Sequence, residues 1–128
     1  MAGKNLLLLL LLLLMSCSSL EPVSPRFSTG PVMDEHQAAR LYARGEVSPR
    51  YSWLRENVFP LCNYCHPQKR ANFLSYNGVM QVVVPGNPEA SLLYQKVASG
   101  QMPPGALHLS EQKIQAIYDW IRLGAKKD

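Results

Sequence analysis

The stretch Cys62-Asn63-Tyr64-Cys65-His66 places two cysteines three residues apart and a histidine directly after the second cysteine. On one turn of chain, thiols at this spacing can both reach the same edge of a flat ring. The imidazole of His66 then lies beneath that ring, where one of its nitrogens can coordinate a central metal ion. A chain that holds such a ring covalently needs no deep enclosing pocket, so these five residues decide how a small domain can fold.

This spacing is the attachment signature of c-type haem, in which the two cysteines form thioethers with vinyl groups. Three other interpretations compete with it. A Cys62–Cys65 disulfide does not require the histidine, and a thioredoxin-like redox pair needs a βαβ context that the sequence does not show. A zinc site needs four ligands, and His36 and His108 lack zinc-like spacing. We therefore predict one covalent haem c, held by Cys62 and Cys65, with His66 as an axial ligand of its iron.

Met102 is the predicted second axial ligand. It lies in the loop Gly100-Gln101-Met102-Pro103-Pro104-Gly105, where two prolines restrict the backbone and so help to hold a thioether in place. Met/His ligation raises the reduction potential of haem iron. Met80 lies among valines and is expected to be a core residue. His108 is the main alternative to Met102.

The N-terminus has the pattern of an export signal. Lys4 precedes nine consecutive leucines, and this run is shorter than the roughly 20 apolar residues that cross a membrane. Leu14-Met15-Ser16-Cys17 resembles the lipobox of bacterial lipoproteins, which implies cleavage after residues 1–16 and acylation of Cys17. We therefore expect an exported protein, anchored by lipid to a membrane and facing the periplasm. Ser18 after the cysteine favours the outer membrane.

The 128-residue chain has room for one domain after this signal. Residues 17–33 contain three prolines and a glycine, which predicts a flexible tether, and residues 34–128 form the haem-binding domain. The net charge of +4 falls by one when Lys4 is removed, and the basic residues are scattered. Nucleic acid is therefore not an expected partner, and we expect a monomer.

Hydrophobic spacing and capping residues predict an all-α domain of three to five short helices. Asn77-Gly78 is typical of a turn, and Val82–Val84 is a short extended run. The loops are long for so small a core, so a flat apolar prosthetic group would supply its centre. The expected helices span Asp34–Arg44, the segment from Ser48 as N-cap to Phe59 with Pro60 ending it, the segment between Asn87 and Gly100, and the segment between Ser110 and Gly124.

Three further segments carry a family resemblance: Val83–Tyr94, Gly100-x-Met102-Pro103 and Trp120–Ala125. Together with the Cys-x-x-Cys-His motif, they resemble class I c-type cytochromes with a single haem, over roughly Trp53 to Ala125. The resemblance implies a class I cytochrome c-like fold wrapped around one covalent haem. It implies that the N- and C-terminal helices cross beside the haem, and the Leu54–Val58–Phe59 and Ile117–Tyr118–Ile121 surfaces are candidates for this crossing.

The resemblance also implies electron transfer to and from redox partner proteins, with His66 as proximal and Met102 as distal ligand. We see no nucleophile–base pair, paired carboxylates or phosphate-binding loop in the sequence, so an electron carrier is expected rather than an enzyme. Two alternatives stay open. One is a haem enzyme, such as a peroxidase, or a gas or redox sensor with a labile sixth ligand. The other is a structural lipoprotein with a disulfide and no haem.

Overall fold

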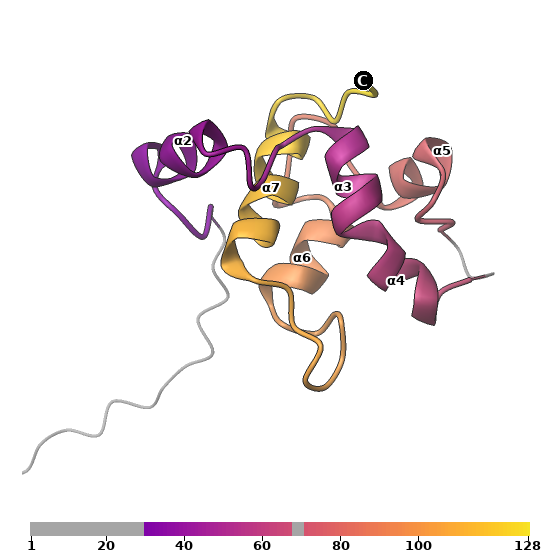
Figure 1. The fold of residues 1–128 in the computed structure, drawn as a ribbon. Helices are drawn as coiled ribbons and strands as arrows, with labels where there is room; N and C mark the ends of the chain where they lie inside the picture. Colours follow the sequence, from indigo (N-terminus) through magenta and orange to yellow (C-terminus); the bar gives the residue numbers. More distant parts are fainter. Residues whose placement is uncertain (1–29, 68–70) are drawn as a thin grey trace, which may run out of the picture.

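The computed structural model of the protein describes residues 30–67 and 71–128 (Figure 1). These residues form six α-helices and one 3-10 helix and contain no strand, which confirms the all-α prediction for the described part of the chain. The predicted signal peptide, Cys17 and the rest of the predicted tether up to residue 29 lie outside it. No helix of the described residues is long and apolar enough to cross a membrane. The elements are α2 (Glu35–Ala43), α3 (Tyr51–Asn57), α4 (Phe59–Cys65), α5 (Tyr76–Val79), the 3-10 helix η1 (Met80–Val82), α6 (Leu92–Ala98) and α7 (Glu111–Arg122).

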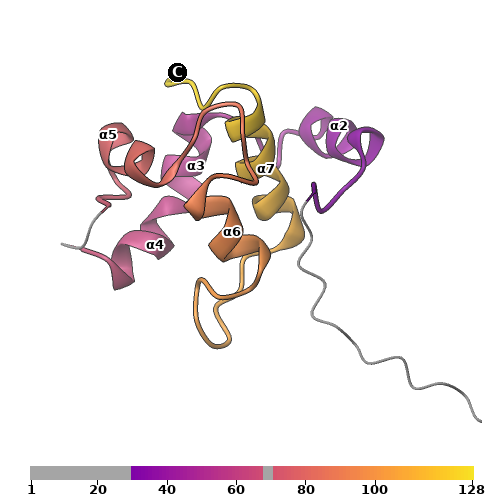
Figure 2. The same cartoon turned by 180° about the vertical axis from the view of Figure 1, so that it is seen from behind.

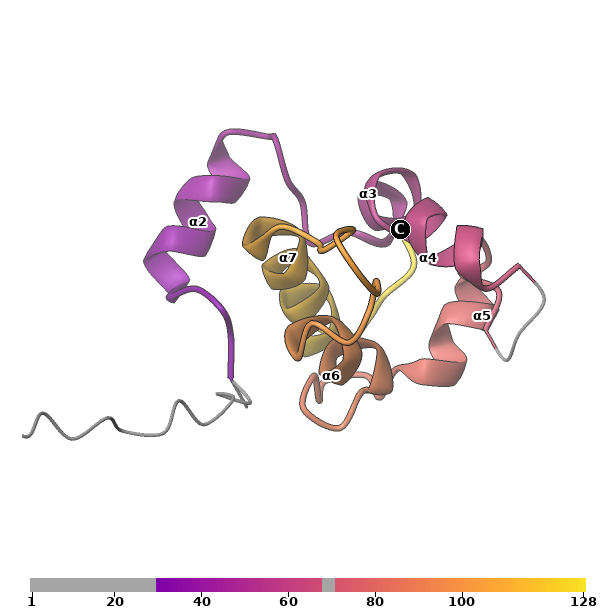
Figure 3. The same cartoon turned by 90° about the horizontal axis from the view of Figure 1, so that it is seen from below.

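Helix α7 is the centre of the domain and contacts α2, α3 and α6 (Figure 1). Ile117 and Ile121 of its predicted apolar stripe are fully buried, and Trp120 beside them is 2% exposed. Burial of each such side chain contributes about 1.5–3 kcal/mol, so this face holds the helices together. Seen from behind in Figure 2, the loop after α6 extends beyond both α6 and α7. Figure 3 shows α2 and α5 at opposite ends of the domain.

Two helices, α2 and α7, begin at the capping residues that the sequence predicts, whereas α6 does not. Asp34 caps α2 in a capping box with Gln37, and Arg44 follows the last helical residue, which confirms the helix expected over 34–44. Ser110 caps α7 by accepting a hydrogen bond from the backbone N–H of Lys113 at 3.4 Å. The helix expected after Asn87 begins later, with Ser91 as N-cap.

The expected single helix before the cysteines is wrong. The chain breaks at Val58, whose φ of −128° and ψ of −56° are not helical, and α4 then starts with Pro60 in its first turn. A proline is tolerated there because the N–H it lacks would have no partner within the helix. Cys62 and Cys65 therefore lie on a helix rather than after one. With α5, this split raises the number of α-helices among the described residues above the three to five expected.

The capping role predicted for Ser48 is also wrong. Helix α3 begins at Tyr51, and its N-cap residue, Arg50, makes no side-chain capping bond. The carboxylate of Asp128 takes this role: it accepts hydrogen bonds from the backbone N–H of Ser52 at 2.9 Å and from its hydroxyl at 2.6 Å. The capping group is thus distant in the sequence, so the residues around α3 could not have predicted it.

Asn77-Gly78 does not form a turn but lies inside α5. A Cβ atom at Gly78 would overlap the backbone carbonyl of Asn72, so glycine is needed for a close approach of two chain segments. The extended run predicted over Val82–Val84 is present in part. Val82 ends η1, and Val83 has the extended φ of −126° and ψ of 135°.

Candidate cofactor cavity

A cavity of about 550 Å³ lies between α4, α6 and the loop that follows α6. Its size is within the range of ligand pockets, roughly 300–1,000 Å³. The cavity brings together all four residues predicted to hold a haem: Cys62, Cys65, His66 and Met102. The other lining residues are Leu61, Ala71, Phe73, Val82, Leu92, Leu93, Lys96, Val97, Pro103 and Pro104.

Helix α4 contributes both thiols to this cavity. Cys62 is half-buried, its Sγ donates to the carbonyl oxygen of Val58 at 3.9 Å, and Cys65 is exposed. Burial raises the pKa of the Cys62 thiol to about 11, so this side chain stays protonated at neutral pH. Neither cysteine is in a disulfide. The two sulfurs are therefore separate thiols that line one cavity.

His66 follows α4 directly and ends it. Its backbone N–H donates to the carbonyl oxygens of Cys62 and Asn63, both at 3.2 Å, which fixes the residue against the last turn. The imidazole lies beside the ring of Phe73, with 6.1 Å between the ring centroids, and Phe73 in turn lies 6.3 Å from Phe59. The imidazole is therefore positioned between the cavity and the aromatic core.

Met102 reaches the cavity from the loop after α6. Gly100, with a φ of +71°, allows the chain to leave the helix in a conformation that disfavours other residues. The backbone N–H of Met102 then donates to the carbonyl oxygen of Lys96 at 3.0 Å, and Lys96 Nζ donates to Gln101 Oε1 at 2.6 Å. Lys96 of α6 thus takes part in two hydrogen bonds that hold the start of the loop carrying Met102. Met102 itself is 38% exposed.

The rival ligands do not line the cavity. His108 and His36 are exposed, and Met80 packs against the hydrophobic core as expected. Among residues 30–67 and 71–128, no three His, Cys, Asp or Glu side chains come close enough to hold a metal ion. The described residues therefore do not assemble the ligands of a zinc site.

The residues at the cavity fit a haem in three respects. Its walls are almost wholly apolar, as a flat hydrophobic ring requires. One helix supplies two thiols, and the residue after it supplies an imidazole. A thioether, the second common axial ligand of c-type haem iron, lines the same cavity from another segment.

The sequence did not reveal most of the cavity wall. On α6, the apolar side chains of Leu92, Leu93 and Val97 face the cavity together with Lys96. A single lysine within an apolar helical face was a signal that could have marked α6 as part of the site. No local pattern could have marked Ala71 or Phe73, because their place depends on how the chain between α4 and α5 packs.

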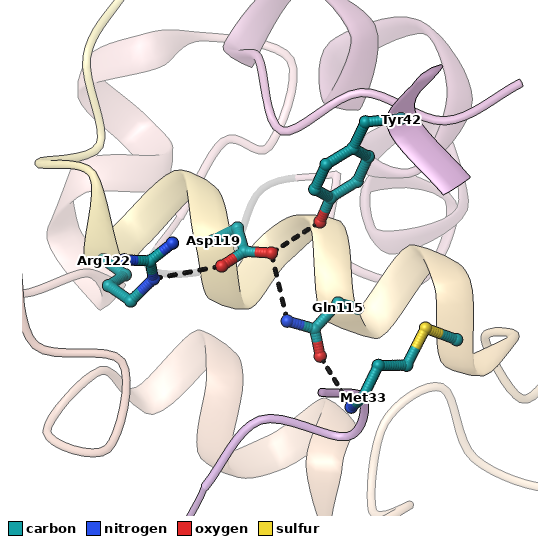
Figure 4. A network of polar contacts seen from close by, with 5 residues as sticks. All are labelled: Met33, Tyr42, Gln115, Asp119 and Arg122. Carbon is teal, nitrogen blue, oxygen red and sulfur yellow. Dashed lines mark hydrogen bonds and ion pairs between the residues drawn. The ribbon is translucent and has the colours of Figure 1, made fainter. Parts of the chain in front are cut away.

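A second cluster of polar groups joins α2 to α7 (Figure 4). Asp119 is 5% exposed and accepts hydrogen bonds from Tyr42 Oη at 2.6 Å and Gln115 Nε2 at 3.0 Å. Its other oxygen accepts from Arg122 Nε at 3.1 Å. Gln115 Oε1 accepts from the backbone N–H of Met33 at 2.9 Å. We call Tyr42, Gln115, Asp119 and Arg122 the Asp119 cluster.

In comparison with known proteins, the chain matches no family model, no curated protein and no solved structure. Its function is therefore inferred from its own residues and from the cavity that they form.

Proposed function

We propose that the protein is a mono-haem c-type cytochrome, an electron carrier rather than an enzyme, that works outside the cytoplasm. One observation carries the proposal. Cys62, Cys65, His66 and Met102 line one apolar cavity, although all of α5, η1 and α6 separate the methionine from the other three in the sequence. A disulfide-bonded structural lipoprotein gives no reason for a methionine and a histidine to meet at the cysteines.

In this proposal, Cys62 and Cys65 would hold haem c through thioethers, while His66 and Met102 would bind its iron. When bound, the haem supplies reversible one-electron chemistry at its iron. Helix α4 fixes both sulfurs and the imidazole on one short segment. The apolar walls would limit the access of water to a bound haem, and the hydrogen bond from the backbone N–H of Met102 to Lys96 holds the methionine loop at the cavity. Exclusion of water and a thioether ligand both raise the potential at which iron is reduced.

We further propose that the fold is of the class I cytochrome c type. Helices α3 and α7 contact each other, and Leu54, Val58 and Phe59 join Ile117 and Ile121 in one buried core. In this proposal, the contact between α3 and α7 is the helix crossing that the resemblance implies. Tyr118 differs from the expectation: it is only partly buried and lies against Tyr94, with 5.1 Å between ring centroids.

We propose that lipid at Cys17 anchors the exported chain to a membrane, with the domain in the periplasm as a monomer. Two contacts show where the described chain joins the domain. Tyr94 Oη donates to the carbonyl oxygen of Gly30 at 2.6 Å, and the backbone N–H of Met33 donates to Gln115. The described chain thus meets the domain at α6 and α7, whereas the cysteines lie on α4 (Figure 1). We propose that redox partner proteins approach the cavity from the side of α4.

The test is a reduced-minus-oxidised absorbance spectrum together with the intact mass of the exported protein. We expect a c-type haem spectrum that survives denaturation, a mass increase of one haem, and acyl chains on Cys17. A colourless protein would contradict the proposal. Ready binding of carbon monoxide by the ferrous protein at neutral pH would instead support the enzyme or sensor alternative.

A further inference from the structure

Among the described residues that line the cavity, Lys96 alone carries a charge. The others are apolar, apart from the two cysteines and His66. In residues 57–67 and 71–110, Glu89 and Lys96 are the only Asp, Glu, Lys or Arg residues. Lys96 is half-buried, so its aliphatic stem can pack against the apolar wall while its ammonium group stays exposed at the edge of the cavity.

Lys96 has a neutral partner in the structure. Its Nζ donates one hydrogen bond to Gln101 Oε1 at 2.6 Å, and an ammonium group has three donors. Among the described residues, the one ion pair joins Arg122 to Asp119 in the other cluster. Lys96 thus brings to the cavity a positive charge that no described carboxylate neutralises.

The position of this charge is fixed relative to the rest of the site. The carbonyl oxygen of Lys96 accepts from the backbone N–H of Met102, while its ammonium group holds the side chain of Gln101. The amide of Gln101 keeps its Nε2 donors available when Oε1 accepts from the lysine. Lys96 and Gln101 together can therefore donate to both oxygens of an anionic group.

We infer that Lys96, which lines the cavity, and its exposed partner Gln101 form a carboxylate-binding corner at the edge of the cavity, which takes a carboxylate of the bound ligand. This inference rests on the proposed function. Haem fits this chemistry because it carries two carboxylates, its propionates, on the edge opposite its vinyl groups. The cysteines on α4 hold one edge, and α6 supplies the positive charge for a carboxylate on another. A charge-assisted hydrogen bond of this kind is stronger than a neutral one.

The first test measures the midpoint reduction potential of the haem-loaded full chain. Lys96→Gln should lower the potential, because a positive charge near the iron favours the reduced state, which carries less positive charge. Lys96→Arg should restore it. Lys113→Gln is the matched control: Lys113 Nζ also donates to a neutral oxygen, that of Asn57 at 3.0 Å, but does not line the cavity. Its replacement should leave the potential unchanged.

Three results of this test would overturn the inference. The first is an unchanged potential in Lys96→Gln, and the second is an equal shift in Lys113→Gln. The third is a change in the axial-ligand bands of Lys96→Gln, since the lysine would then act on the iron and not on a carboxylate.

The second test separates this inference from the proposed function. The full chain, prepared without haem, is titrated with iron-free protoporphyrin and with its dimethyl ester, which lacks both negative charges. We expect the wild-type chain to bind the dicarboxylate about tenfold more tightly, and Lys96→Gln to lose this preference. Equal binding of both compounds would refute the carboxylate corner and leave the cytochrome proposal intact. A lysine-dependent preference in a chain that never acquires covalent haem would support the corner and refute the cytochrome.

Discussion

The Asp119 cluster and the α4–α6 cavity satisfy their polar groups in opposite ways. In the cluster, each oxygen of a buried carboxylate has a donor from the chain itself (Figure 4). In the cavity, two thiols, an imidazole, a thioether and an ammonium group line walls that are otherwise apolar. The carboxylate of the first region is satisfied within the chain, whereas the second region presents its polar groups to an apolar hollow.

This difference indicates what each region does. Satisfied buried polar groups hold elements in a fixed arrangement, and the Asp119 cluster does so for α2, which buries only Ala38. Reactive groups around an apolar hollow contribute little to folding by themselves, but they can bind a ligand. We therefore expect substitutions in the cluster to change stability and substitutions at the cavity to change redox properties.

Replacement of both cysteines should have the largest effect. In Cys62→Ser with Cys65→Ser, we expect complete loss of covalent haem, because a hydroxyl does not form the thioether. Intact mass and a spectrum under denaturing conditions measure this loss. Each single replacement should keep one thioether and serves as the control. Covalent haem in the double variant would mean that the ligand is held elsewhere.

Met102→Ala should keep the haem but change its iron. Loss of the thioether should lower the midpoint potential and allow carbon monoxide to bind the ferrous protein. Met80→Leu is the control, because Met80 packs against the core and does not line the cavity. If Met102→Ala has the wild-type potential and spectrum, Met102 is not a ligand, and His108 becomes the next candidate.

Asp119→Ala should reduce the free energy of unfolding by about 3 kcal/mol, because Gln115 and Tyr42 lose their acceptor. Urea unfolding measures this change, and hydrogen exchange should show that α2 opens first. Asp119→Asn keeps one acceptor oxygen and should lose less stability. The midpoint potential should not change in either variant. A shifted potential would show that the two regions are coupled, and it would contradict the claim that the Asp119 cluster affects stability alone.

The sequence predicted these two regions to different extents. At the cavity, Cys62, Cys65 and His66 belong to one local motif and Met102 to a short loop pattern, and the structure brings these four residues together. The Asp119 cluster could not be predicted, because Tyr42 and Asp119 belong to different helices and only their contact explains a buried charge. The caps Asp34 and Ser110 were predicted, because each accepts from a backbone N–H three residues later. The role of Pro60 was predicted wrongly, because a backbone break at the preceding Val58 decides it.

Tyr42→Phe should have a smaller effect, about 1 kcal/mol at neutral pH, through loss of one hydrogen bond. Burial, followed by the hydrogen bond to Asp119 and its charge, raises the pKa of Tyr42 above its usual value of 10. The resulting stability is fully present below pH 10 and is lost as pH rises through the raised pKa. Unfolding between pH 9 and about 11 should therefore depend less on pH in Tyr42→Phe. Equal pH dependence in both proteins would contradict the role of this hydroxyl.

Asp128 is an exposed counterpart of Asp119, and its replacement should have the smallest effect. Its side chain accepts two hydrogen bonds from Ser52, and these lower its pKa below the usual value. A lowered pKa gives stability that is present above the usual value and is lost as pH falls through the folded-state pKa. Because solvent screens an exposed carboxylate, Asp128→Asn should cost about 0.5 kcal/mol or less at neutral pH. The difference from wild type, measured by urea unfolding, should shrink as pH falls below the usual pKa of the carboxyl group and through its lowered folded-state pKa. An effect as large as that of Asp119→Ala would mean that burial is not what distinguishes the two carboxylates.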